Sequence, residues 1–363
     1  MIRSVEIKGL RGIRTGGLTD LTPLVVLVGP NGSGKSTILD ALLIAANPRP
    51  PDAIGQAVER REGVSACEGA RWLLWKAGQE GPAEVSVRTG SGVRSCTFSI
   101  AAFTKDHTAI QGKVRDKDAN GKTTETDINM SFEAGEPPGR YGFFKPLDDV
   151  PDVRFIDPRA VSMRTPLHQL YTRVVEHGLH MAAIESIRAL IPDVKDIQIL
   201  APEDMPVVYL NFGASVAGGY AVPAALAGDG IRLLLHLTFE LATRPGGLVL
   251  MEEPEVHMHP GAIRQCARVI LAAVRREIQI VLSTHSLELI DALVGESSDE
   301  DLKQLSLYRL QLQAGVPKLP PVPEGGPVLG AWEIVKLAGT LKSSRLAGPD
   351  VAFARTEIQD DLR

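Results

Sequence analysis

Residues 29–36 read Gly-Pro-Asn-Gly-Ser-Gly-Lys-Ser, and this stretch decides the fold. It fits the phosphate-loop pattern GxxxxGK[ST] at every defined position. It follows the apolar run Leu24–Val28 and precedes a helical pattern from Ser36 to about Ala46. A chance glycine-rich turn is the alternative, and the strand–loop–helix context disfavours it. The segment therefore predicts a phosphate-binding loop within an α/β fold.

Each part of this loop has a chemical role toward ATP. Small residues let backbone N–H groups point at the phosphates, and the start of the next helix adds the positive end of its dipole. We expect Lys35 to contact the β- and γ-phosphates and the Ser36 hydroxyl to bind Mg²⁺. The predicted nucleotide-binding residues of the loop are Asn31, Gly32, Ser33, Gly34, Lys35, Ser36 and Thr37.

A second apolar run, Leu248-Val-Leu-Met-Glu-Glu-Pro254, ends in two carboxylates. In open α/β sheets, ligands bind beyond the carboxyl ends of the strands. We expect Glu252 to hold Mg²⁺ and Glu253 to orient and polarise the attacking water. The alternative is a solvated acidic turn after a buried strand, which the nearby phosphate loop makes the weaker interpretation.

Two further segments extend this predicted site. In Leu226-Ala-Gly-Asp-Gly-Ile-Arg232, exposed N–H groups at a helix start can bind the γ-phosphate of a nucleotide held by a second subunit; an ordinary capped turn is the alternative. Ser283-Thr-His-Ser286 ends the next strand. His285 is predicted to hydrogen-bond the γ-phosphate or the attacking water, against the alternative of a capping role.

The order of these motifs resembles the ABC-ATPase heads of the SMC, RecF and overcoming-lysogenization-defect (OLD) group. The opening Ile7-Lys-Gly-Leu-Arg-Gly-Ile13 and the run Glu252-Glu-Pro-Glu-Val-His-Met-His-Pro260 are similar to segments of that group. The resemblance implies that two heads enclose two ATP molecules, with Gly228 and Gly230 of one head facing the Lys35 loop of the other. It also implies that Arg11 contacts the nucleotide.

The chain departs from the family pattern at several points. Gly228 stands where these heads usually carry Ser, which implies slow hydrolysis or weak dimerisation. No glutamine has the context of the family's glutamine loop, and Arg159 is the substitute that we consider. The chain lacks a zinc-hook CxxC and the acidic set of a Toprim nuclease. His257 and His259 form an HxH pair without an evident third ligand, which favours a structural or dimer-contact role over a metal site.

The predicted fold class is α/β: a P-loop ABC-ATPase head with a mainly parallel sheet, an antiparallel β-rich insertion and a helical lobe. Helices are expected over 166–191, with a break at Gly178, and a short helix near 330–341. The predicted divisions are 1–51 for the first part of the core, 52–160 for the insertion, 161–196 for the helical lobe, 197–313 for the second part of the core and 314–363 for a tail.

Composition limits the possible partners. The formal net charge of −5 gives no support to a strongly basic nucleic-acid binder, although a local DNA-binding groove is compatible with it. No stretch reaches the roughly 18 uncharged apolar residues of a membrane helix, so no membrane partner is predicted. The three cysteines form no CxxC pair, and a cytoplasmic location is expected.

The combined hypothesis is an ATP-hydrolysing head that dimerises when ATP binds. The resemblance implies a setting in DNA repair or anti-phage defence, with a homodimer, a separate nuclease or toxin as partner, and ATP and Mg²⁺ as cofactors. One alternative is a nucleotide-dependent scaffold that does not hydrolyse ATP, which Gly228 keeps open. Another is the ATPase subunit of a transport-type ABC system, which the missing Leu-Ser-Gly-Gly-Gln disfavours.

Overall fold

The fold is described here from a computed structural model of the 363-residue chain. The structure describes residues 1–61, 63–133, 139–141, 152–158, 165–215, 218–244, 246–312 and 332–336. Arg159 and most of the predicted tail lie outside these ranges. No helix in the described ranges is both long enough and apolar enough to cross a membrane.

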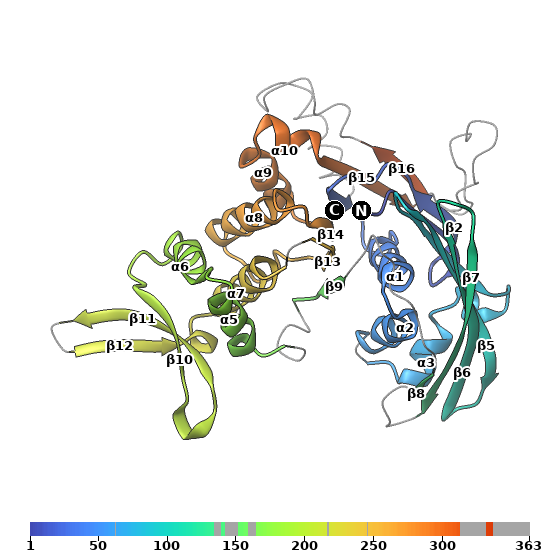
Figure 1. The fold of residues 1–363 in the computed structure, drawn as a ribbon, viewed down its shortest axis with the longest axis horizontal. Helices are drawn as coiled ribbons and strands as arrows, with labels where there is room; N and C mark the ends of the chain where they lie inside the picture. The colour runs from blue at the N-terminus through green and yellow to red at the C-terminus, as the bar shows by residue number, and fades with distance from the viewer. Residues whose placement is uncertain are drawn as a thin grey trace.

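A mainly parallel sheet forms the centre of the molecule, as predicted (Figure 1). Its strands, in spatial order, are β9 (Val153–Ile156), β13 (Leu248–Glu252), β14 (Gln279–Ser283), β3 (Leu24–Val28), β15 (Leu305–Leu312) and β16 (Trp332–Lys336). All neighbouring pairs are parallel except β15 with β16. Every residue of β3, β13 and β14 is buried, which explains why these strands read as continuous apolar runs.

The prediction of a helix near 330–341 is wrong over residues 332–336, which form strand β16. This strand pairs with β15 at the edge of the central sheet. Two β-branched residues, Ile334 and Val335, lie within the five-residue run, and an unpaired strand edge was available to it. The sequence pattern alone did not reveal that edge.

A second, antiparallel sheet covers one side of the central sheet. Its strands, in spatial order, are β2 (Ile13–Leu18), β1 (Ser4–Leu10), β4 (Ala83–Arg88), β5 (Gly92–Phe103), β6 (His107–Asp118), β7 (Thr123–Glu133) and β8 (Gly139–Tyr141). Strand β1 pairs with β2 on one side and with β4 on the other, so the antiparallel strands of the predicted insertion extend an N-terminal hairpin. One hydrophobic core contains residues on both sides of the predicted boundary between residues 51 and 52. This division of the chain therefore stays a prediction.

Helix α1 (Lys35–Ala46) lies between these two sheets and contacts strands of both (Figure 1). Apart from Ser36, all of its residues are buried. From Ile38 onward the helix is apolar except for Asp40, as expected for a helix in such an interior position. Helix α2 (Pro50–Glu59) packs beside it, followed by α3 (Ala66–Arg71) and the short 3₁₀ turn η1 (Trp75–Gly78).

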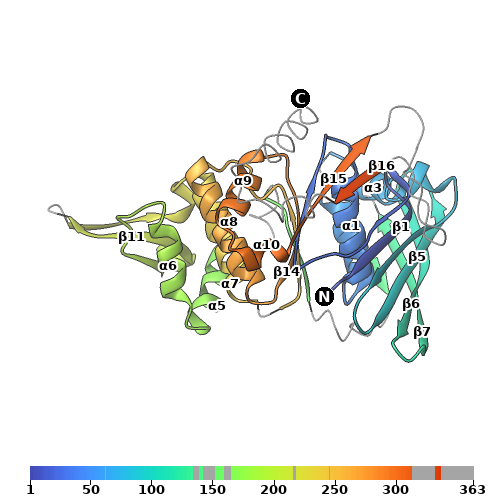
Figure 2. The same cartoon turned by 90° about the horizontal axis from the view of Figure 1, so that it is seen from above.

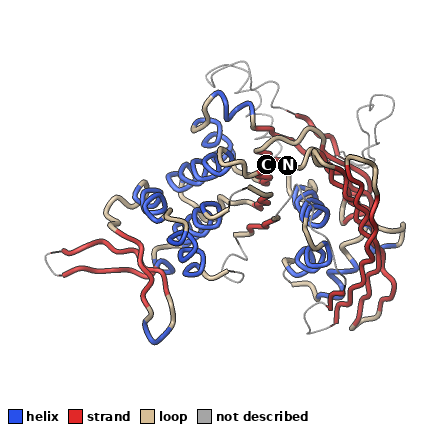
Figure 3. Tube along the Cα trace, viewed as in Figure 1, coloured by secondary structure: helices blue, strands red, loops and turns tan. Residues whose placement is uncertain are grey.

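The other face of the central sheet carries the remaining helices, and a small sheet projects from that end of the molecule (Figures 2 and 3). Gly178 has a φ of +69° and separates the first two helices, as predicted. The helices are α5 (Leu167–Glu176), α6 (His180–Arg188), α7 (Asp229–Ala242), α8 (Pro260–Val274), α9 (Leu287–Gly295) and α10 (Asp299–Lys303). The small sheet consists of β10 (Asp196–Leu200), β11 (Val207–Ser215) and β12 (Gly218–Pro223), with the 3₁₀ turns η2 (Pro202–Asp204) and η3 (Ala224–Leu226) beside it.

Gly112 on β6 supplies a test of how tightly the antiparallel sheet is packed. A Cβ at this position would lie 2.1 Å from the carbonyl oxygen of Thr97 and 2.7 Å from the Cα of Phe98. Gly112→Ala is therefore expected to lower the free energy of unfolding by roughly 1–3 kcal/mol in urea denaturation, because β5 and β6 must separate. In the control Gly295→Ala the new methyl has nothing within 4 Å, so stability should not fall. Equal effects of the two changes would contradict this packing.

Candidate active site

The phosphate loop connects β3 to α1 and depends on glycine at its first position. Gly29 has a φ of +142°, and a Cβ there would lie 2.1 Å from the carbonyl oxygen of Leu310. Gly34 adopts a left-handed conformation with a φ of 89° and caps α1. The strand–loop–helix context predicted for residues 29–36 is therefore present, and the helix start points its free N–H groups at the loop.

The predicted loop residues differ in their exposure. Asn31 and Gly32 are exposed at the tip, whereas Ser33, Lys35 and Thr37 are buried. Lys35 Nζ donates to the carbonyl oxygens of Gly29 at 2.7 Å and Pro30 at 3.0 Å, so the ammonium lies within the curve of the loop. Burial lowers the pKa of Lys35 to about 8, and the charges of Glu253 and Glu252 oppose this shift in part.

Ser36 and Glu252 meet directly although they are 216 positions apart in the chain. The Ser36 hydroxyl donates to Oε1 of Glu252, which ends strand β13. Burial acts to raise the pKa of Glu252, but Arg60, the Ser36 hydrogen bond and Arg61 outweigh it and hold this pKa below its usual value. Mg²⁺ prefers oxygen ligands, so a hydroxyl beside an ionised carboxylate fits the metal that the loop implies.

Glu253 and His285 lie beside this pair at the same edge of the sheet. The backbone N–H of Glu253 donates to the carbonyl oxygen of Ser283 at 2.9 Å, which joins the ends of β13 and β14. His285 Nε2 then lies 3.4 Å from Oε1 of Glu253. Glu253 has a φ of +48°, a conformation that non-glycine residues adopt rarely and often at functional sites. The turn thus directs the carboxylate toward the histidine.

The environment of His285 favours its neutral form at neutral pH. Burial and the nearby charge of Lys35 lower the pKa of His285, and Glu253 opposes them in part. Thr284, the residue before it, is fully buried and donates its hydroxyl to Oε1 of Glu255. Oε2 of Glu255 has no hydrogen-bond partner among the described residues, and burial raises the pKa of this carboxyl. Glu255 and Thr284 therefore brace the acidic turn against the histidine segment.

Three arginines surround the site, and two of them were missed by the sequence analysis. Arg60 and Arg61 follow α2 and reach both Glu252 and Asp40, a fully buried carboxylate on α1. No motif covers the segment from which they come. In the sequence, only Asp40 indicated that charged partners would gather here. It lies four residues after Ser36 and therefore on the same face of the helix.

Arg11 was predicted to contact the nucleotide, and the structure places its guanidinium on Asp40. Nε of Arg11 donates to Oδ2 of Asp40 at 2.7 Å, and the terminal amine donates to the carbonyl oxygen of Ala57 at 2.7 Å. Arg11 therefore links the turn between β1 and β2 to both α1 and the end of α2. A direct contact between Arg11 and the nucleotide stays a prediction.

Gly228 and Gly230 lie at the start of α7, as the sequence pattern predicted. Gly228 caps the helix with a φ of +98°. A Cβ on Gly230 would lie 2.9 Å from the carbonyl oxygen of His257, in the segment that follows the acidic turn. His259 caps α8 by accepting from the N–H of Gly261 at 3.3 Å, which gives this histidine a structural role.

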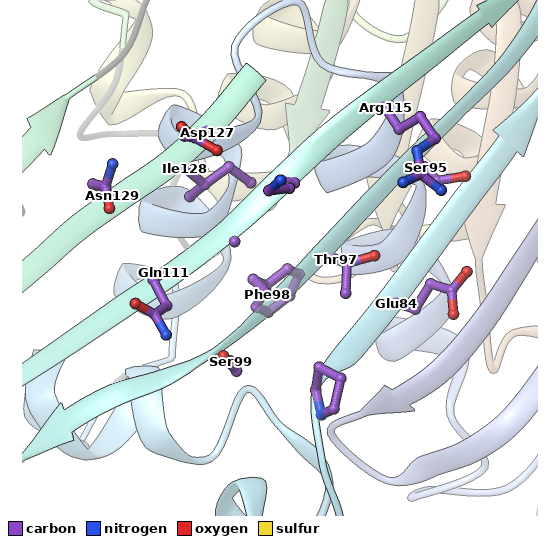
Figure 4. Close-up of a pocket in the computed structure, with 13 residues that line it drawn as sticks. Glu84, Ser95, Thr97, Phe98, Ser99, Gln111, Arg115, Asp127, Ile128 and Asn129 are labelled. Atoms are coloured by element: carbon purple, nitrogen blue, oxygen red, sulfur yellow. The ribbon is translucent and has the colours of Figure 1, made fainter. Parts of the chain in front are cut away.

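A hollow of about 600 Å³ lies apart from this constellation, on the antiparallel sheet (Figure 4). Strands β4 to β7 supply its lining, which includes the charged side chains of Glu84, Lys113, Arg115 and Asp127. None of the predicted site residues lines it. The mixed charges are typical of the solvated face of an antiparallel sheet.

Two family models and one curated relative match parts of this chain. A family model described as "AAA domain, putative AbiEii toxin, Type IV TA system" matches residues 102–291, more than half of the chain. A second model, described as "AAA ATPase domain", matches residues 1–134. An uncharacterized protein of Methanocaldococcus jannaschii is 28% identical over 82 residues, which cover 22% of this chain and 72% of that protein.

Solved structures that align with this chain include heads of SMC proteins. The SMC head domain from Thermotoga maritima aligns with a TM-score of 0.44 and 15% identity, over 92% of this chain and 98% of that one. An SMC head domain with an extended coiled coil, bound to the C-terminal domain of ScpA derived from Pyrococcus furiosus, aligns with a TM-score of 0.49 and 12% identity, over 94% and 98%.

The family models together span the phosphate loop, the acidic strand and the histidine segment. An AAA ATPase domain implies nucleotide binding, and the residues predicted to serve it meet at one edge of the central sheet. The chain therefore belongs to the family described as "AAA domain, putative AbiEii toxin, Type IV TA system", whose model covers more than half of it.

Proposed function

We propose that this chain hydrolyses ATP and that hydrolysis controls the pairing of two heads. The observation that carries the proposal is the meeting of Ser36, Glu252, Glu253 and His285 at the carboxyl ends of β3, β13 and β14, beside Lys35. Ligands of open α/β sheets bind at this edge. The arrangement combines a phosphate cradle, a metal-binding oxygen pair and a carboxylate that can act on water.

Each side chain has a separate task in the proposed reaction. Lys35 neutralises charge on the β- and γ-phosphates, and Ser36 with Glu252 would hold Mg²⁺, which supplies further neutralisation of the phosphoryl oxygens when bound. Glu253 accepts a hydrogen bond from the attacking water and polarises it. Neutral His285 donates a hydrogen bond to the γ-phosphate or to that water, and its 3.4 Å approach to Glu253 keeps the two groups aligned.

The dimer part of the proposal rests on the positions of two exposed segments. Asn31 and Gly32 lie exposed at the tip of the loop, and Gly228 and Gly230 begin α7 elsewhere on the same chain. Leu226, two residues before Gly228, is 75% exposed, an apolar side chain suited to burial in an interface. A second head would bring its α7 start to the γ-phosphate held by the first, where the free N–H groups favour an anion.

The family description, which names a putative AbiEii toxin of a type IV toxin–antitoxin system, supports a proposal for the biological setting. We place the head in phage defence, with DNA repair as the other setting that its resemblance supports. A separately encoded nuclease or toxin would be the partner that the nucleotide state controls, and DNA is a candidate ligand of the paired heads. ATP binding and hydrolysis by the paired heads would then act on that partner through a conformational change.

Glu253→Gln tests hydrolysis and pairing together. The variant keeps the size of the side chain and removes the base, so turnover should fall by at least a hundredfold while ATP binding is retained. ATP should then hold the variant as a dimer in light scattering, whereas Glu288→Gln, at an exposed glutamate on α9, should behave like the wild type. Binding without turnover in the wild type would instead support the non-hydrolysing scaffold.

The lowered pKa of Lys35 predicts proton uptake when nucleotide binds at high pH. The free protein loses this proton above about pH 8, and phosphate anions favour the charged form and raise the pKa. Binding should therefore take up almost no proton near pH 7 and up to one near pH 9, where affinity falls as pH rises. Calorimetry with excess Mg²⁺, in buffers of different ionisation heat, measures this uptake.

The exposed lysine Lys303 on α10 provides the control for that measurement. Lys303→Gln should show the same proton uptake as the wild type. Heats that do not depend on the buffer near pH 9 would show that Lys35 is not the titrating group.

A further inference from the structure

Arg60 is held in place by four separate contacts around the nucleotide site. Its side chain is 1% exposed and follows directly after α2. Nε and a terminal amine donate to Oδ1 of Asp40 at 2.8 and 2.5 Å, and the other amine donates to Oε2 of Glu252. The carbonyl oxygen of Ser36 lies 3.3 Å from the guanidinium, which also stacks on the ring of Phe155 at 4.3 Å.

This arrangement places a permanent cation on the carboxylate predicted to hold magnesium. Glu252 receives the Ser36 hydroxyl on one oxygen and Arg60 on the other. A divalent cation bound to the same carboxylate would lie close to the guanidinium in a site that is 4% exposed at Glu252. Like charges repel strongly where water is largely excluded, so full occupation of Glu252 by both cations is unfavourable.

Asp40 allows Arg60 to leave Glu252 without becoming an unpaired buried charge. Two nitrogens of Arg60 already contact Asp40, and this carboxylate is fully buried on α1. An arginine buried without any partner would be strongly unfavourable. With Asp40 as a second anchor, Arg60 would keep a charged partner after releasing Glu252.

We propose that Arg60 competes with magnesium nucleotide for Glu252 and so sets the magnesium concentration at which the head loads. The inference rests on the proposed function of the site and adds a regulating residue to it. Arg60 acts through Glu252 and is a positioning residue, not a group that touches the reacting atoms. Because Arg60 directly follows α2, its release from Glu252 also links metal loading to a helix that packs on α1.

Arg61 offers a matched control for this proposal. It lies 3.6 Å from Oδ2 of Asp40 and 3.8 Å from Oε1 of Glu252, and its side chain is 30% exposed. Arg61→Gln therefore removes the same charge from the same cluster but no close contact. Arg60→Gln removes the close contact, and Asp40 keeps Arg11 at 2.7 Å as a partner, which supports the fold.

The experiment measures binding of a fluorescent ADP analogue as Mg²⁺ is titrated, so that the readout does not depend on turnover. The half-saturating Mg²⁺ concentration should fall roughly tenfold in Arg60→Gln, which corresponds to one close ion pair of about 1.4 kcal/mol. It should change by less than about threefold in Arg61→Gln, because a partly exposed pair at longer range is weak. A rise in Arg60→Gln, or equal shifts in both variants, would overturn the proposal.

A second variant keeps the test decisive if Arg60→Gln does not fold. Arg60→Lys retains the charge but loses the planar fork that contacts two carboxylates at once. Its half-saturating Mg²⁺ concentration should lie below that of the wild type, and a value at or above the wild type's would contradict the competition.

Failure of the proposed function gives a different result. Wild-type protein that binds nucleotide in a Mg²⁺-dependent way without hydrolysing it would defeat the ATPase proposal and leave this inference standing. Nucleotide binding that is the same with and without Mg²⁺ would overturn the inference alone. Wild-type protein that binds no nucleotide would overturn both.

Discussion

The burial of helix α1 between two sheets is the constraint on which the rest of the structure depends. The helix begins with Lys35 and Ser36, so any shift of it would move the phosphate loop. Its apolar faces pack on strands of both sheets. One hydrophobic core around the helix therefore contains residues from the N-terminus to β15. The core thus fixes the loop from all sides and leaves only its tip exposed.

The same burial also encloses a charged side chain of the helix, which therefore needs partners of opposite charge. Asp40 is fully buried, and an unpaired carboxylate in that position would cost roughly 3–5 kcal/mol. Arg11 from the first hairpin and Arg60 from the end of α2 meet this demand from opposite directions. Arg60 extends from there to Glu252, so one ion-pair network connects the core helix to the carboxyl end of β13.

The order of the strands decides which side chains meet at the edge of the central sheet. Strand β14 lies between β3 and β13, which brings His285 close to both the phosphate loop and the acidic turn. The backbone bonds from Glu253 to Ser283 and from Thr284 to Leu27 fasten the three strand ends together. Because parallel strands end at a common edge, groups that are far apart in the chain become neighbours without long connecting loops.

The sequence by itself determined the phosphate loop, the acidic strand end and the histidine segment, because each depends on residues close together in the chain. It also predicted the mainly parallel sheet, because apolar strands alternate with helices along the chain. The roles of Gly29 and of the run Leu248–Glu252 can each be predicted from a few consecutive residues. Only the tertiary structure decided the roles of Asp40, Arg60 and Arg61. The contact between Arg60 and Glu252 joins positions 192 apart, and no local pattern specifies which buried carboxylate a distant arginine will reach. Strand β16 shows the same limit, since its conformation depends on an open edge of β15 that only the assembled sheet provides.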